Sequence, residues 1–247
     1  MVTRNKALIF HRQEKKMKYF VENADPVFVG AVMRSSFRIF SGVCLALGLV
    51  TLGGCVTGPP QLPSSLLSLV ETLRAGGNVI YMRHVTADVG RDVQGAGEWW
   101  KKCGEGHRML SAKGRSDAIQ VGEAIRRLRI PISQVYCSEY CRAVETSRLL
   151  SLGEPKTDVR LNGWPAWKAV DPSRGLHRLS HGTRELLAAR PAQGNVLLVS
   201  HKQDFPDPTD PVLADLQDGE CAVFTPDGWG GFALRGRIKV EDWAALK

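Results

Sequence analysis

The feature that most constrains the fold is a short apolar run at 195–200, with the sequence Asn-Val-Leu-Leu-Val-Ser. It is the most apolar strand-like segment of the chain. Because its side chains do not alternate between apolar and polar, both faces of such a strand have to be covered. We therefore expect it at the centre of a sheet that carries helices on each side.

Strand-like and helix-like segments alternate along the rest of the chain. Short runs of strand-forming residues are separated by segments whose apolar residues have helical spacing. This alternation predicts an α/β fold: a three-layer α/β/α sandwich around a mainly parallel central sheet. We predict strands at 78–82, 132–137, 195–200, 221–224 and 232–240, and helices at 112–128, 142–150 and 172–189.

One segment does not fit the alternation. Residues 89–108, between the first predicted strand and the first predicted helix, are rich in glycine. Loops of that length are uncommon in compact domains and are usually functional or mobile. We expect one of these two roles for this loop.

Residues 1–54 are predicted to be an N-terminal extension and a lipoprotein-type signal peptide. From Met33, a short cationic stretch precedes an apolar segment at 39–52 and then Gly53-Gly54-Cys55, as in secretory signal peptides. The apolar segment is short for a membrane-spanning helix, which needs about 20 apolar residues; an uncleaved anchor helix is the alternative. Because residues 1–32 are polar and cationic, we expect Met33 to be the true start.

The end of this segment, Leu-Gly-Gly-Cys at 52–55, resembles a bacterial lipobox. In a lipobox the cysteine thiol receives a diacylglycerol and becomes the first residue of the mature protein. The resemblance implies a lipidated Cys55 and a protein anchored at the periplasmic face of a bacterial membrane. Residues 55–67, rich in Pro, Gly and Ser, are predicted to be a tether, and residues 68–247 are predicted to be the folded domain.

The positive charge of the chain is concentrated in this N-terminal segment. The formal net charge is +8, from 33 Lys/Arg and 25 Asp/Glu. Residues 1–54 hold eight of the basic and three of the acidic residues, which leaves 25 basic against 22 acidic and a net charge of +3. We therefore expect no nucleic-acid partner.

Four cysteines remain once Cys44 and Cys55 are set aside, namely Cys103, Cys137, Cys141 and Cys221. In an oxidising compartment an even set permits disulfides, with three possible full pairings. The chain has no Cys-x-x-Cys pair, so a zinc site is poorly supported and no metal is expected.

Two predicted strands lead into a histidine. In an open α/β sheet, ligands bind outside the carboxyl ends of the strands. The first strand leads into Arg83-His84, and the apolar central strand leads into Ser200-His201. Arg142 follows a third strand at the start of a helix, where backbone N–H groups favour anions. Two histidines and two arginines that converge on one crevice would suit a tetrahedral dianion such as phosphate.

Each of these residues also has a simpler explanation on its own. An Arg-His pair is common by chance, and His201 could cap a strand through a ring hydrogen bond. Arg142 could pair with Glu139 or Glu145 on a solvated helix face. Their combination, in order and at strand and helix ends, favours a site.

The same residues belong to four blocks that resemble the histidine phosphatase superfamily, in its phosphoglycerate-mutase-like branch. The blocks occur in the family's order and span most of the chain from Asn78 to Trp243. They are an apolar strand leading into Arg-His at 83–84, Leu-Ser-x-x-Gly-x-x-x-Ala at 110–118, Ser-x-x-x-Arg-Ala-x-x-Thr at 138–146, and an apolar strand leading into Ser-His at 200–201.

The resemblance implies a phosphomonoesterase of the histidine acid phosphatase type that acts on a small phosphorylated substrate without a metal or other cofactor. Neutral His84 attacks phosphorus in line and forms a phosphohistidine. Arg83 and Arg142 bind the non-bridging oxygens, and His201 donates a hydrogen bond to a phosphoryl oxygen. The two arginines are expected to lower the pKa of His84 and keep it unprotonated.

The sequence departs from the family where the general acid is expected. Many members carry a Glu after Arg-Leu-Asn, but here Gly163 follows 160–162; Val85 also replaces a common Gly. A leaving oxygen needs a proton unless it already leaves easily. Asp88, Asp204 and Glu220 are the candidates. The missing acid keeps a second hypothesis open, a catalytically weak lipoprotein that binds a phosphorylated ligand on the same fold.

The chain also resembles an exported, lipoprotein-like subset of this family. That subset carries cysteines where Cys103 and Cys141 fall, which implies a disulfide between these two residues. Four free buried thiols are the alternative, because free cysteine is commonly buried.

Overall fold

The computed structural model describes residues 64–104, 106–163, 165–166, 176–202 and 211–246. The predicted signal peptide with Met33, the lipidated Cys55 and most of the tether lie outside the described residues, as does Asp204. In the part of the chain that is described, no helix combines the length and the apolar character needed to cross a membrane.

Six strands form one sheet in the order β3-β2-β4-β1-β5-β6. Strands β3, β2, β4 and β1 pair in parallel, whereas β5 and β6 are antiparallel and complete one edge. The predicted α/β fold with a mainly parallel sheet is confirmed, and the apolar run at 195–200 forms an interior strand, as predicted. The strands are β1 (Val79–Arg83), β2 (Ile132–Cys137), β3 (Pro155–Thr157), β4 (Asn195–Ser200), β5 (Cys221–Pro226) and β6 (Phe232–Ile238).

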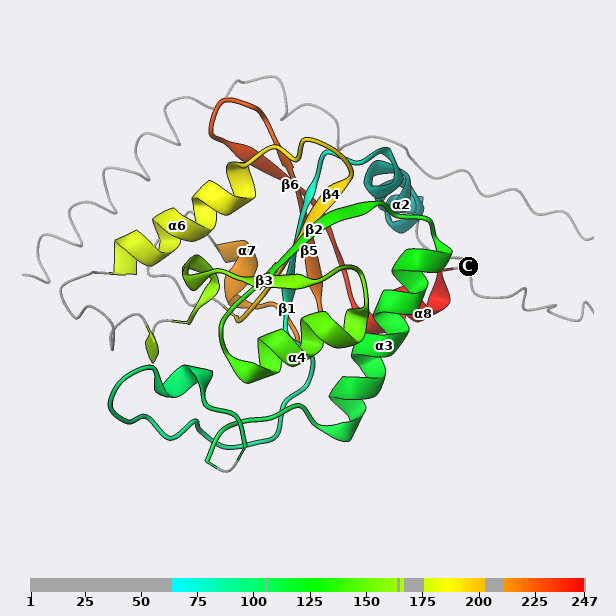
Figure 1. Ribbon diagram of the computed structural model, residues 1–247. Coiled ribbons are helices and arrows are strands. Elements are labelled where there is room, and N and C mark those ends of the chain that lie inside the picture. The colour runs from blue at the N-terminus through cyan, green and yellow to red at the C-terminus, as the bar shows by residue number, and fades with distance from the viewer. Residues whose placement is uncertain (1–63, 105, 164, 167–175, 203–210, 247) are drawn as a thin grey trace, which may run out of the picture. The chain divides into compact units, whose positions relative to one another are not determined.

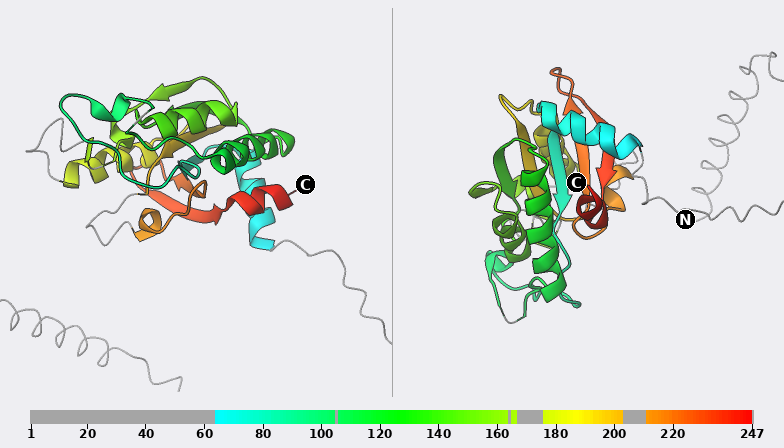
Figure 2. Two further views of the ribbon diagram at one scale, coloured as in Figure 1. Left: turned by 90° about the horizontal axis from the view of Figure 1, so that it is seen from below. Right: turned by 90° about the vertical axis from the view of Figure 1, so that its right-hand side faces the viewer.

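Helices flank the sheet on both sides. In Figure 1, α3 (green) and α6 (yellow) lie on opposite sides of the strands, and Figure 2 shows α2, α3 and α8 gathered at one side. The helices are α2 (Ser64–Ala75), α3 (Ala112–Arg127), α4 (Cys141–Leu150), α6 (Leu176–Ala188), α7 (Pro211–Ala214) and α8 (Val240–Ala245), with 3-10 turns η2 (Trp99–Lys101) and η3 (Val159–Leu161). Helix α2 begins ahead of the predicted domain start at residue 68, and its Leu66 is buried.

Two hydrophobic clusters lie on the two faces of the sheet. Along β1, Ile80 and Met82 belong to the cluster beneath α2, α3, α4 and α8, whereas Val79 and Tyr81 belong to the cluster that includes residues of α6 and α7. The alternation follows from the two-residue period of a strand. Because both faces are buried, β1 and β4 are held firmly where they lead into the site.

The second sequence block has a structural role next to the first. Ser111 caps α3: its Oγ accepts from the Gly114 N–H at 3.0 Å and donates to the Thr86 carbonyl at 3.1 Å. A Cβ at Gly114 would collide with that same carbonyl. Glycine therefore lets the start of α3 pack directly on the backbone that follows His84, and so fixes that segment.

Candidate active site

The pairing of β1 with β4 brings the two histidines together. Arg83 and Ser200 are partners in the parallel register, and the His84 N–H donates to the Ser200 carbonyl at 2.8 Å. The rings of His84 and His201 lie edge to face with centroids 5.3 Å apart. Both side chains are buried. The register of two neighbouring strands thus produces a pair of imidazoles at the carboxyl edge of the sheet.

His84 presents the lone pair of its Nε2 to Arg142. Its Nδ1 lies 2.8 Å from the Val85 carbonyl, which can only accept, so Nδ1 carries the proton and Nε2 the lone pair. The Nε–H of Arg142 donates to that Nε2 at 3.1 Å. Burial, with the charges of Arg142 and Arg83 contributing less, lowers the pKa of His84 to about 3. The ring is neutral, as predicted, but burial has a larger effect than the arginines that the sequence pointed to.

His201 is held by a chain of polar side chains. Its Nε2 lies 2.8 Å from the Ser138 Oγ, and that hydroxyl donates to the Asn162 Oδ1 at 3.0 Å. Because a hydroxyl has one hydrogen, His201 is the donor to Ser138. Burial first, then the charge of Arg142, lowers the pKa of His201 well below its usual value. Ser138 and Asn162 occur in the motifs quoted above, but nothing in the sequence assigns them this contact.

Arg142 connects His84 to a carboxylate that the sequence did not indicate. It lies in the first turn of α4, is 8% exposed, and sits over the Tyr140 ring at 4.5 Å. Its Nη1 forms an ion pair with Asp92, at 3.0 Å to Oδ2 and 3.2 Å to Oδ1. One guanidinium therefore contacts both His84 and Asp92.

Arg83 directly precedes His84 and is held by two contacts. Its Nη1 donates to the Leu216 carbonyl and its Nη2 pairs with Asp218, both at 2.7 Å. Its buried Nε has no hydrogen-bond partner among the described residues, so one donor remains for an anion. The predicted role of Arg83 in binding phosphate fits this arrangement and stays a prediction.

None of the described acid candidates contacts the histidines or Arg142. Glu220 is buried, but its two oxygens accept from Arg237 at 2.8 and 2.7 Å. The side chain of Asp88 is exposed. An ideal Cβ on Gly163 would lie 3.8 Å from the His201 ring, so position 163, where the family resemblance expects a Glu, does adjoin the site.

The loop 89–108 is anchored to the site by aromatic residues. Trp99 and Trp100 in η2 are each 2% exposed and cluster with Tyr140, whose ring is 4.7 Å from that of His201. The Trp100 Nε1–H donates to Glu139 at 2.9 Å. Of the two roles expected for this loop, these contacts support the functional one.

The disulfide implied by the family resemblance is confirmed. Cys103 in the loop is bonded to Cys141, directly before Arg142, with Cα atoms 5.7 Å apart. Cys137 and Cys221 are buried free thiols, and burial raises the pKa of Cys137 to about 11 and that of Cys221 to about 12. The alternative of four free thiols is therefore wrong.

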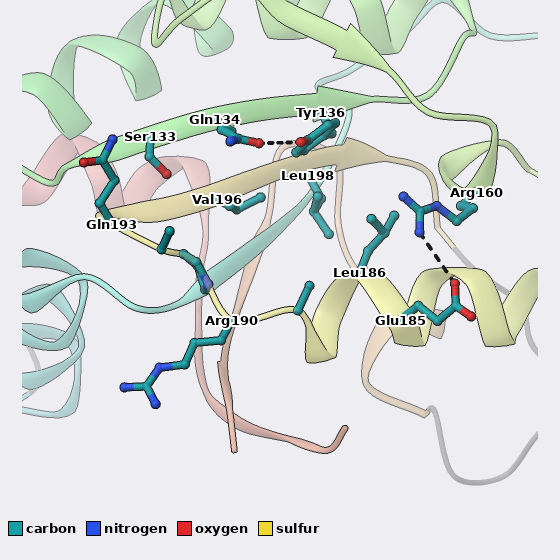
Figure 3. A pocket seen from close by; sticks show the side chains of 13 residues that line it. Ser133, Gln134, Tyr136, Arg160, Glu185, Leu186, Arg190, Gln193, Val196 and Leu198 are labelled. Atoms are coloured by element: carbon teal, nitrogen blue, oxygen red, sulfur yellow. Dashed lines mark hydrogen bonds and ion pairs between the residues drawn. The ribbon is translucent and has the colours of Figure 1, made fainter. Parts of the chain in front are cut away.

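A hollow of about 400 Å³ lies between α6 and the strands β2 and β4 (Figure 3), and neither histidine lines it. Val196, Leu198 and Leu186 line it, and Arg160 and Glu185 pair across it at 3.5 Å. Among the described residues, no group of three or more His, Cys, Asp or Glu could hold a metal ion.

The chain matches no model of a known protein family. Over 99 residues it is 29% identical to the agropine synthesis reductase of Rhizobium rhizogenes, a match that covers 39% of this chain. The chain thus spans 20% of the length of that curated relative.

Solved structures that resemble the chain belong to the histidine phosphatase superfamily. They include the protein histidine phosphatase SixA complexed with tungstate (TM-score 0.44, 15% identity, 69% of this chain and 99% of that one). A phosphoserine phosphatase mutant from Entamoeba histolytica in complex with phosphoserine has a TM-score of 0.42 and 13% identity, over 67% and 98% of the two chains. A mycobacterial glucosyl-3-phosphoglycerate phosphatase has a TM-score of 0.41 and 17% identity, over 64% and 96%. At these values the likeness does not define an activity.

Proposed function

We propose that this chain hydrolyses phosphomonoesters through a phosphohistidine formed on His84. The observation that carries the proposal is the state of that side chain: buried, neutral, with Nδ1–H fixed on the Val85 carbonyl and the Nε2 lone pair facing Arg142. A neutral imidazole nitrogen that faces a guanidinium can attack a phosphoryl group bound to that guanidinium.

Substrate binding releases the nucleophile. In the free protein the Nε–H of Arg142 is donated to the lone pair of His84. A phosphate dianion is a stronger acceptor than an imidazole, so this N–H turns to a phosphoryl oxygen and leaves the lone pair free. His84 Nε2 then bonds to phosphorus as the ester P–O bond breaks. Water attacks the phosphohistidine in the second step, which releases orthophosphate and restores His84.

His201 stabilises charge on the phosphoryl group. Its Nε2–H is committed to Ser138, so the ring can donate to substrate only through Nδ1. A dianion beside the ring favours protonation at that nitrogen. Arg83, with its unpartnered buried Nε, adds a second positive charge.

The proposal extends to the place of action. The short apolar segment and the Leu-Gly-Gly-Cys sequence at 52–55 support lipidation of Cys55 and a location at the periplasmic face of a bacterial membrane. The substrate is then a small phosphorylated molecule of the cell envelope. Mass spectrometry of the protein from its native host should find a diacylated Cys55 as the first residue; an intact leader contradicts this part.

The test of the activity is phosphate release from 4-nitrophenyl phosphate, whose leaving group needs no acid. Rapid quenching of the reaction with labelled substrate should trap a phosphoenzyme that is stable in alkali and labile in acid. Binding of phosphate without turnover would instead support the weakly catalytic binding protein.

A further inference from the structure

We propose that Asp92 is the proton donor to the leaving oxygen, the role for which the chain has no residue at 163. This inference rests on the proposed hydrolysis at His84. Asp92 is the acidic side chain in direct contact with Arg142, at 3.0 Å, and its own side chain is 13% exposed. Neither Asp88 nor Glu220 has a comparable contact among the described residues.

The geometry places the donor and the nucleophile around one anion site. Arg142 presents its Nε to His84 and its Nη1 to Asp92. A phosphoryl group bound by that guanidinium therefore lies beside both side chains. His84 directly follows β1, whereas Asp92 belongs to the loop 89–108, which lies beyond that end of β1 in Figure 1. In-line displacement needs the attacking and leaving atoms on opposite sides of phosphorus, so the proposal requires Asp92 to reach the leaving oxygen on the side away from His84.

The loop holds Asp92 in a defined position. The Arg108 N–H donates to the Asp92 Oδ1 at 2.9 Å, and the Val93 N–H donates to the Gly106 carbonyl at 2.8 Å. These two bonds join the two arms of the loop beside the carboxylate. The buried Trp99 and the Cys103 disulfide anchor the rest of the loop. A carboxylate on a loop fixed in this way is positioned for chemistry.

The charge next to Asp92 is that of Arg142, which it contacts directly, and the Tyr140 hydroxyl is close enough to interact electrostatically with both groups. A phosphomonoester bound at Arg142 shares the N–H groups of that guanidinium with Asp92. In the proposed reaction Asp92 acts in its protonated form, with the proton taken from solvent.

The proton balance closes over the two steps. As His84 Nε2 bonds to phosphorus, the P–O ester bond breaks and its electron pair goes to the leaving oxygen, which receives the Asp92 proton and departs as an alcohol. In the second step water attacks phosphorus as the bond between His84 Nε2 and phosphorus breaks; the proton that the water loses passes to solvent, and Asp92 regains one from solvent. Orthophosphate leaves and the acid is regenerated.

The test compares Asp92→Asn with wild type on two substrates, 4-nitrophenyl phosphate and the alkyl ester glycerol 3-phosphate. On the alkyl ester, kcat of the variant should fall about 10²–10⁴-fold, the range of general acid catalysis. On the aryl ester, kcat should stay within about threefold of the wild-type value. The matched control is Glu98→Gln, which removes a charge from the same loop where it pairs with exposed Lys101. It should behave as wild type on both substrates.

A double variant checks that the lost function is proton donation. A Cβ at Gly163 would meet its neighbours at ordinary contact distances of 3.7–4.0 Å, so Gly163→Glu introduces a carboxyl at a position that adjoins His201. Added to Asp92→Asn, this change should raise kcat on the alkyl ester at least tenfold above that of the single variant. The alkaline limb of the alkyl kcat profile, absent in Asp92→Asn, should return with it.

Three results separate the possible failures. Equal losses on both esters, with an unchanged unfolding midpoint, would mean that Asp92 only positions Arg142, and would overturn the inference. A lower KM on both esters at unchanged kcat would mean that Asp92 merely competes with phosphate, which also overturns it. Failure of wild type to turn over either ester refutes the hydrolase itself.

Discussion

His84 and His201 are placed by the sheet, whereas Asp92 is placed by the loop 89–108. The first two occupy positions fixed by the register of β1 with β4, both buried on two faces. Among its described residues the loop has only the short η2 as regular structure, and it is held by Trp99, Trp100 and a disulfide. The sheet therefore positions the proposed nucleophile, and the loop positions the proposed proton donor to the leaving oxygen.

This division predicts that changes in the sheet remove activity on every substrate, whereas changes in the loop act selectively. Packing against a fixed sheet tolerates little movement, because interiors are close-packed. The loop is held by the disulfide and by Trp99 and Trp100, and these contacts can be removed while the sheet stays folded.

The largest effect is expected from His84→Ala. Because no other described side chain faces Arg142 with a nitrogen lone pair, phosphate release and phosphoenzyme trapping should both fall to background for aryl and alkyl esters. The control is His107→Ala, a histidine of the loop. Retention of activity by His84→Ala would refute the mechanism.

The next effect concerns the disulfide. Replacing Cys103 and Cys141 together by serine removes a covalent link between residues that are 38 positions apart in the sequence. This should lower the free energy of unfolding by about 2–4 kcal/mol. Because the bond anchors the loop, activity on alkyl esters should fall about tenfold more than activity on aryl esters. Chemical denaturation and the ratio of the two kcat values measure this. Equal losses on both substrates would show that the bond fixes Arg142 and not Asp92.

The third prediction is a pH dependence of stability that comes from the sheet. The folded pKa of His84 is about 3, below its unfolded value near 6.5. Between these values the unfolded chain binds a proton that the folded chain does not, so stability falls as the pH is lowered. As the pH falls from 6.5 to 4.5, the contribution of His84 should lower the free energy of unfolding by about 2–3 kcal/mol. Urea denaturation should show the loss, and His84→Gln should reduce it; an unchanged slope would contradict a buried neutral ring.

The same contrast explains what the sequence could reveal. The strands and His84, His201 and Arg142 follow from periodicity, strand ends and family blocks, because each depends on local pattern or on the register of two central strands. Asp92 was missed because the loop offers several acidic residues, among them Asp88 and Glu98, and only the fold decides which of them meets Arg142. The His201–Ser138–Asn162 chain was missed for the same reason, since β2 and η3 join it only in the folded chain.

The smallest effect is expected from Ser138→Ala. The hydroxyl accepts the His201 Nε2–H and donates to Asn162, and so fixes the tautomer and orientation of the ring. Its loss leaves one buried ring N–H without an acceptor, which costs about 1–3 kcal/mol locally, and lets the ring turn away from the phosphoryl oxygen. We expect kcat to fall about tenfold on both esters, because charge stabilisation acts on every leaving group, while KM changes little. The matched control is Ser147→Ala, another buried serine, whose hydroxyl donates to the Ala143 carbonyl within α4. If both serine variants lose the same activity, the effect is one of packing; a loss confined to the alkyl ester would instead place Ser138 in the proton-donating path of the loop.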